Sequence, residues 1–163
     1  MTIAIATFST LNASSVSSMG FSDTANKLKE LSDKLCDYLR HPLTLGLQPF
    51  DVFNELCELA EECAEEGWDG ENAKPVTKAV FDEGFRFLKS LPLGTAVPSV
   101  SAEPDGHITF EWYHSTSRIL SVSIDSDGFL HYAAIIGPKK AYGSEPLVTG
   151  TPKAIVDLIG QVV

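Results

Sequence analysis

Apolar residues in the N-terminal part of the chain recur every three or four positions, which is the spacing of amphipathic helices. The pattern predicts three helices, over residues 22–42, 50–66 and 75–90. Gly67 suits the left-handed conformation that ends a helix, and Pro75 lacks the N–H that the first turn of a helix would leave unpaired. The third helix carries too many large apolar residues for one narrow stripe, so we expect a sheet against its second side.

Beyond residue 98 the apolar positions alternate with polar ones, which is typical of strands. Strands are predicted at residues 107–113, 118–124 and 129–136, with an edge strand at 98–103 and a last, irregular strand at 141–148. Short connections favour an antiparallel meander, and Thr151-Pro152 is expected to begin a closing helix. The predicted fold class is α+β: N-terminal helices packed on one face of an antiparallel sheet of four or five strands, with a C-terminal helix.

Residues 21–163 are predicted to form a single domain after a flexible N-terminal arm, residues 1–20. Weak alternation over residues 3–8 leaves an extra strand as the alternative for the arm. The sequence contains neither an apolar run long enough to span a bilayer nor the pattern of a signal peptide. Cys36, Cys57 and Cys63 lack CxxC spacing and are expected to be buried thiols. We therefore expect a cytoplasmic protein without a membrane partner.

Strand alternation assigns the predicted sheet residues to two faces. One set is apolar and should pack on the helices: Ile108, Phe110, Trp112, Leu120, Val122, Ile124, Leu130, Tyr132, Ala134 and Ile136. The opposite, outer set is mixed, and four of its members are larger and more apolar than a solvated face requires: Tyr113, Ile119, Phe129 and Ile135. The favoured expectation is that the C-terminal helix or the N-terminal arm covers this outer face, and the alternative is a partner.

Acidic residues are concentrated in and just after the second predicted helix. The chain carries 22 acidic and 12 basic residues, a net charge of −10, which argues against nucleic acid as a direct partner. Between Arg40 and Lys74 there is no Lys or Arg, and one predicted helical face carries a regular series of carboxylates: Asp51, Glu55, Glu58, Glu62, Glu65 and Asp69. This face is either a solvated surface or a docking surface for a basic partner protein, and mimicry of nucleic-acid charge is a variant of the second.

Motifs for catalysis and for metal binding are absent from the sequence. The histidines form neither HExxH nor a zinc spacing with cysteine, so no metal or cofactor is expected. Glu111, Ser123 and His131 share the outer sheet face and are the candidates for a small-molecule-binding or hydrolase-like site, although no GxSxG elbow supports it. The leading hypothesis is a non-enzymatic interaction module, such as an inhibitor or an antitoxin-like or immunity-like regulator.

One stretch is distinctive: Gly67-Trp68-Asp69-Gly70, followed by Ala73 and Pro75. This stretch resembles a family of small uncharacterised bacterial proteins, together with Pro98-Ser99-Val100-Ser101, Pro104-Asp105-Gly106, Glu111-Trp112 and Leu120-Ser121-Val122-Ser123. Those proteins show a W-D-G-x-x-A-x-P segment and a PSVS…PDG…EW hairpin, and the likeness runs from about Gly67 to the C-terminus. The resemblance implies no activity. It supports a folded domain in which the motif residues are structural: Gly67, Trp68, Asp69, Gly70, Pro75 and Trp112.

Overall fold

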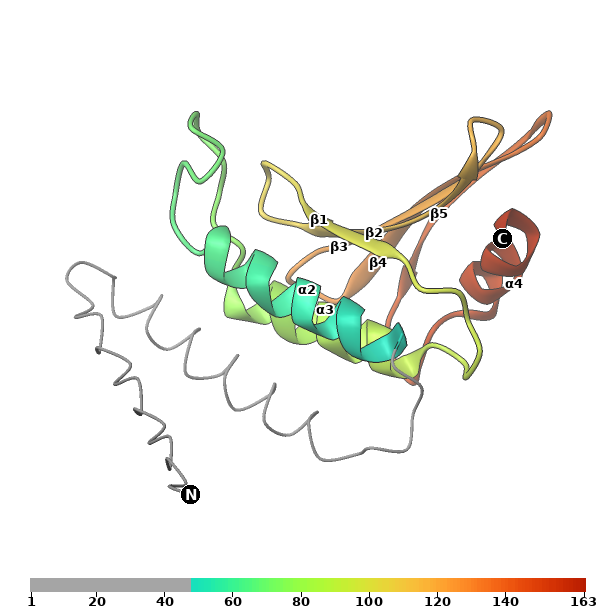
Figure 1. The fold of residues 1–163 in the computed structure, drawn as a ribbon, viewed down its shortest axis with the longest axis horizontal. Helices are drawn as coiled ribbons and strands as arrows, with labels where there is room; N and C mark the ends of the chain where they lie inside the picture. The colour runs from blue at the N-terminus through green and yellow to red at the C-terminus, as the bar shows by residue number, and fades with distance from the viewer. Residues whose placement is uncertain (1–47) are drawn as a thin grey trace, which may run out of the picture.

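Two helices precede a five-stranded sheet and one follows it in residues 48–163, the part of the chain that the computed structural model describes (Figure 1). The helices are α2 (Gln48–Glu62), α3 (Lys78–Ser90) and α4 (Lys153–Val162). The strands are β1 (Ser99–Ala102), β2 (Ile108–Ser115), β3 (Arg118–Ile124), β4 (Phe129–Ile136) and β5 (Lys139–Pro146). The predicted arm, residues 1–20, and the first predicted helix, residues 22–42, lie outside the described residues.

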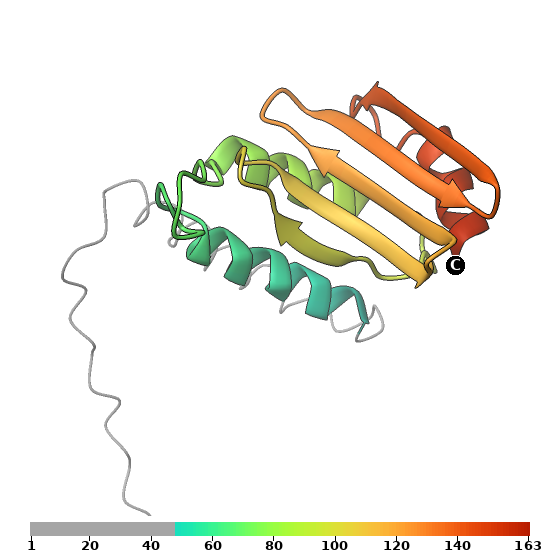
Figure 2. The same ribbon diagram turned by 90° about the horizontal axis from the view of Figure 1, so that it is seen from above.

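The strands form one antiparallel meander in the order β1-β2-β3-β4-β5, so each strand lies beside its neighbour in sequence (Figure 2). The predicted α+β class, with an antiparallel sheet and a C-terminal helix, is confirmed. β5 begins at Lys139, two residues earlier than predicted. The reason is a tight turn: Ile136 pairs with Lys139, and Gly137 between them takes a φ of +59°.

The apolar face of the sheet is buried by the three described helices, which all lie on the same side of it (Figure 1). α2 packs against β1 and α3, α3 against β2 and β3, and α4 against β2, β3 and β4. Large side chains that are less than 2% exposed form the centre of this core: Trp112, Phe81, Phe87, Phe110, Leu56, Ile108 and Leu120. Burial of such a side chain stabilises the fold by about 1.5–3 kcal/mol. The indole N–H of Trp112 donates to the carbonyl of Ala96 (2.7 Å), so this aromatic residue is buried without leaving a polar group unpaired.

α2 ends at Glu62, four residues before the predicted end. Beyond it the chain makes a series of turns up to Gly67, which takes the left-handed conformation expected there, with a φ of +76°. The Gly67 N–H donates to the carbonyl of Ala73 (2.8 Å), a bond across the following loop. Gly67 therefore closes a loop and does not terminate the helix directly.

α3 begins at Lys78 and is capped by Thr77, whose hydroxyl accepts a backbone N–H of the first turn (3.4 Å). The predicted start near Pro75 was wrong, because the residues before the helix are tied to another part of the chain. The N–H of Val76 donates to the carbonyl of Cys63 (2.8 Å), just beyond the end of α2. Thr77 is itself extended, with a φ of −79° and a ψ of 158°, so the helix begins only after it.

The outer face of the sheet carries no helix among the described residues (Figures 1 and 2). α4 packs on the inner face, where Ile155 and Ile159 are buried. Tyr113, Phe129 and Tyr142 on the outer face are 58%, 43% and 83% exposed. The expectation that the C-terminal helix covers the outer face is therefore wrong. α2 and α3 pack against β1–β3, and the apolar stripe of α4 fills the remaining inner surface of the sheet. The other expectation, that the N-terminal arm covers the outer face, falls on residues outside the described part of the chain.

Gly84 provides a test of how tightly α3 packs on the sheet. It is buried, and a Cβ at this position would meet side-chain atoms of Phe110, Ile108 and Leu56 at 3.5, 3.6 and 3.7 Å, which is ordinary contact. Because Ala is about 1 kcal/mol better than Gly inside a helix, we predict that Gly84→Ala raises the free energy of unfolding by about that amount. Urea denaturation measures the change. Gly84→Val, the overpacked control, should lower it, and a loss of stability in Gly84→Ala would contradict the packing described.

Candidate functional site

α2 has one apolar face and one acidic face. Val52, Leu56 and Ala60 are buried in the core, and the carboxylates lie on the opposite side. Every carboxylate from Asp51 to Glu71 is exposed. We call these nine residues the acidic surface: Asp51, Glu55, Glu58, Glu61, Glu62, Glu65, Glu66, Asp69 and Glu71. The exposure predicted for this series is therefore observed, and its first members share one helical face as expected.

The later members of the series, Glu65 and Asp69, do not lie on the helix, because α2 ends before them. Asp69 is committed to the loop that follows. Its Oδ1 atom accepts the backbone N–H groups of Glu71 (2.8 Å) and Ala73 (3.2 Å). The side chain of Asp69 thus builds a turn in the way that aspartate commonly does. Asp69 therefore has two roles: its charge is part of the acidic surface, and its hydrogen bonds fix the conformation of the loop.

Trp68 and Lys74 tie this loop to the turn between β1 and β2. The indole N–H of Trp68 donates to the carbonyl of Lys74 (2.9 Å), and the N–H of Lys74 donates to the carbonyl of Pro104 (2.9 Å). Gly106 has a φ of +89°, and a Cβ there would lie 3.0 Å from the carbonyl oxygen of Pro75. The W-D-G and P-D-G segments are therefore joined through Lys74 and Pro75, which lie between them and contact both.

The carboxylates of the acidic surface lack the ion pairs that several other acidic residues of the described chain form. Elsewhere in the described chain Asp82 pairs with Lys78, Glu83 with Arg86, and Asp157 with Lys153. Within residues 48–163, none of the nine carboxylates of the acidic surface forms an ion pair. Within the described part of the chain, solvent and salt are therefore what reduces their mutual repulsion.

Cys63 lies at the start of the same loop and is buried. Burial, with the neighbouring Glu62 carboxylate as a second cause, raises the pKa of the Cys63 thiol above its ordinary value. A buried thiol with a raised pKa is a poor nucleophile, so Cys63 acts as a small apolar core residue. Cys57 is buried as well, in agreement with the prediction, and Cys36 lies outside the described residues.

Polar residues line up across the outer face in one row of cross-strand partners. The register pairs Thr109 with Ser123, Ser123 with His131, and His131 with Ser144. The hydroxyls of Thr109 and Ser123 are 2.5 Å apart and hydrogen-bond to each other. Glu111 lies in the next row. The three predicted residues thus share one face, but no hydrogen bond joins Ser123 or Glu111 to His131 in the described structure.

His131 lies instead between Asp125 and Ser144. Its Nε2 atom is 3.1 Å from Oδ2 of Asp125, and its Nδ1 atom is 2.7 Å from Oγ of Ser144. The ring of His107 stacks on that of His131, with centroids 6.3 Å apart and planes inclined by 14°. Sequence reasoning named neither Asp125 nor Ser144 as a partner of His131. The sequence feature that could have revealed Ser144 is the tight turn at Gly137. The length of this turn sets the register between β4 and β5, and that register places Ser144 opposite His131.

Asp125 is held by its own turn, where Oδ1 accepts the N–H groups of Asp127 and Phe129, both at 2.9 Å. Partial burial acts to raise the pKa of Asp125. Hydrogen bonds from the Phe129 N–H, the His131 ring and the Asp127 N–H, together with the charge of His131, outweigh burial and hold the pKa below its usual range. Asp125 is therefore ionised at neutral pH and can only accept hydrogen bonds.

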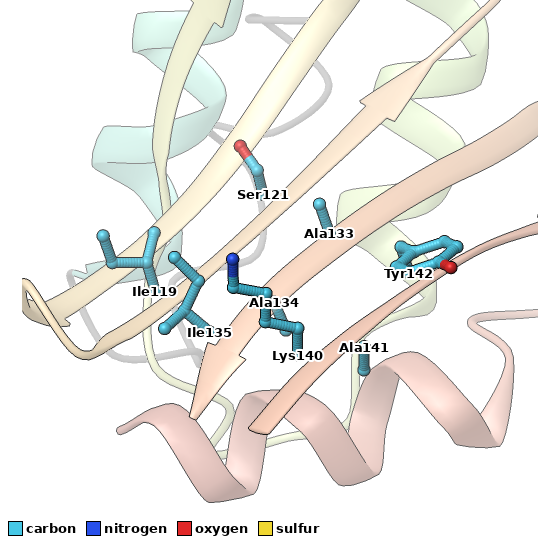
Figure 3. Close-up of a pocket in the computed structure, with 8 residues that line it drawn as sticks. All are labelled: Ile119, Ser121, Ala133, Ala134, Ile135, Lys140, Ala141 and Tyr142. Atoms are coloured by element: carbon cyan, nitrogen blue, oxygen red, sulfur yellow. The ribbon is translucent and has the colours of Figure 1, made fainter. Parts of the chain in front are cut away.

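A shallow depression of about 270 Å³ lies on the outer face over β3, β4 and β5 (Figure 3). We call it the apolar depression. Ile119 and Ile135, which are cross-strand partners, form one end, and Tyr142 lies toward the other. Its full lining is Ile119, Ser121, Ala133, Ala134, Ile135, Lys140, Ala141 and Tyr142. The depression is next to the row that contains His131 and Ser144, because Ala133 and Tyr142 form the next cross-strand pair on the outer face.

Among residues 48–163, no group of His, Cys, Asp and Glu side chains is arranged to hold a metal ion. No helix in the described part is long and apolar enough to cross a membrane. In comparisons with known proteins, no family model, curated protein or solved structure matches the chain. The resemblance to the bacterial family with the W-D-G segment therefore stays a prediction.

Reversing one charge in the middle of α2 tests the repulsion within the acidic surface. Glu58 lies three or four residues from Glu55, Glu61 and Glu62 on the helix. Glu58→Lys replaces three repulsive pairs with attractive ones, so we predict that it raises the free energy of unfolding by about 1–3 kcal/mol at low salt. Urea denaturation at low salt and at about 1 M salt, where the Debye length falls to about 3 Å, measures the effect.

Glu58→Gln serves as the control for this prediction, because it removes the repulsion without adding attraction and should stabilise by about half as much. A gain that is the same at both salt concentrations, or no gain at all, would show that the carboxylates do not repel one another.

Proposed function

We propose that the chain is a protein-interaction module, of the inhibitor, antitoxin-like or immunity-like kind, that binds a basic partner protein through the acidic surface. The observation that carries this proposal is the exposure of nine carboxylates with no Lys or Arg among them. Surfaces that serve solubility alone usually mix charges of both signs. A field of one sign attracts an oppositely charged partner and accelerates its arrival.

The cost of this surface to the stability of α2 supports the proposal. Asp51 and Glu55 are four residues apart, Glu55 and Glu58 three, and Glu58 and Glu62 four. Each such pair of like charges destabilises a helix by about 0.2–0.5 kcal/mol. Glu61 and Glu62 also lie in the last turn, where the helix dipole favours cations. Local features that lower the stability of the fold, and that no other part of the structure requires, are typical of functional sites.

The support beneath the acidic surface is fixed. α2 is anchored through its buried face, and the following loop is held by the Trp68, Asp69 and Lys74 hydrogen bonds. The carboxylates are therefore displayed on a framework that does not have to become ordered when a partner binds. Preorganisation of this kind lowers the entropic cost of association.

The proposal is tested by reversing three charges at the centre of the acidic surface: Glu55→Lys, Glu58→Lys and Glu62→Lys. Tagged full chain is used to capture proteins from a lysate of the native host, and bound proteins are identified by mass spectrometry. We expect wild-type chain to retain a protein rich in Lys and Arg, and the triple variant to lose it. High salt should release the same protein, because contacts between exposed charges are screened.

A matched control reverses three acidic residues away from the acidic surface: Asp127→Lys, Glu145→Lys and Asp157→Lys. Both triple variants raise the net charge from −10 by the same amount. The control should retain the partner, because the surface that contacts it is intact. Equal loss in both variants would mean that net charge alone governs capture, and equal retention would exclude the acidic surface as the binding site.

A further inference from the structure

We propose that Ser144 is an acyl-accepting nucleophile, assisted by His131 and Asp125, for short-chain carboxylic esters bound on the outer face of the sheet. This site is separate from the acidic surface. α2 packs against β1 at one edge of the sheet, whereas Ser144 lies on β5 at the opposite edge. The inference therefore does not depend on the proposed function.

The hydrogen bonds determine where the protons of this group lie. Because Asp125 is ionised and accepts only, Nε2 of His131 must carry the N–H that points at it (3.1 Å). In the neutral tautomer that carries this N–H, Nδ1 has a lone pair and can accept the O–H of Ser144 (2.7 Å). This arrangement of protons is the one in which an imidazole acts as general base toward a hydroxyl nucleophile. Asp125 is a positioning residue, since it acts through His131.

The neighbours of Ser144 and His131 hold the pair in position. Gly143 lies beneath Tyr132 in the adjacent strand, and a Cβ there would be 2.6 Å from the Tyr132 hydroxyl oxygen. Glycine at this position therefore leaves room for the Tyr132 ring against β5, in the residue before Ser144. The ring of His107 lies nearly parallel to that of His131, next to the pair. Reacting groups that are already oriented lose less entropy on the way to the transition state.

The apolar depression indicates the class of substrate. Tyr142 precedes Ser144 by two residues on β5, and Ala133 follows His131 by two residues on β4. Two residues span about 7 Å along a strand, so the depression begins about 7 Å from Ser144 and His131. An ester carbonyl at Ser144 therefore places its acyl chain over the depression. A volume of about 270 Å³ is at the small end of ligand sites, so a short acyl chain fits it and a long lipid chain does not.

The reaction needs no group beyond these side chains, the ester and water. Oγ of Ser144 attacks the carbonyl carbon while its proton passes to Nδ1 of His131. The bond from carbon to the alcohol oxygen breaks, and the leaving alcohol takes the proton from Nδ1. Water then attacks the acyl-serine and gives its proton to Nδ1, which returns it to Oγ as the carboxylic acid leaves. General-base assistance of this kind contributes about 10²–10⁴-fold to the rate.

Hydrolysis of p-nitrophenyl butyrate by the full chain tests the proposal. We expect Ser144→Ala and His131→Gln each to lower kcat/KM by about 10²-fold. Ser123→Ala is the matched control, because Ser123 also lies opposite His131 but bonds to Thr109, and it should keep the wild-type rate. Mass spectrometry of quenched protein should find the butyryl group on Ser144.

Asp125→Asn adds a readout that loss of structure would not produce. It removes the charge that orients His131 but leaves the apolar depression intact, so kcat should fall while KM stays within about twofold, in a variant that remains folded by circular dichroism. Wild-type rates in Ser144→Ala, or butyryl groups on lysines only, would overturn the proposal.

Discussion

The structure depends on the burial of one face of the sheet. Successive residues of a strand point to opposite sides, so the packing of Phe110 and Trp112 against the helices determines which residues face away from them. All three described helices lie on that one side. The outer residues of β2–β5 are left on a surface without helical cover in the described part of the chain. The apolar core thus decides the position of both candidate sites.

The same constraint acts on α2. Its apolar stripe is required to cover the region of β1 and α3, and this turns its other side toward solvent. Nine carboxylates occupy that side and the loop after it. Hydrogen bonds of Trp68 and Asp69 hold the charged loop after the helix, and the Lys74 N–H joins that loop to the β1–β2 turn at Pro104. The result is an extended negatively charged surface over α2 and the following loop, and the proposed function depends on it.

The elements of the fold could be predicted from local patterns, whereas their contacts could not. Alternation identified β3 and β4 with their observed bounds, and short turns implied the antiparallel order. The end of α2 and the start of α3 were misplaced because hydrogen bonds over ten or more residues, such as that of Val76 to Cys63, fix them. Periodicity shows that α4 has an apolar face without showing which side of the sheet it covers. Ser144 was missed because its pairing with His131 depends on the exact length of one turn.

Hydroxyl-radical footprinting of the full chain tests the one-sided sheet most directly. The account predicts rapid oxidation of Tyr113, Phe129 and Tyr142, which are exposed on the outer face, and strong protection of Phe110 and Trp112, which are at most 1% exposed on the inner face. Protection of the outer aromatic residues to the same degree as the inner ones would contradict it, because the outer face would then be covered and Ser144 would be closed to any substrate.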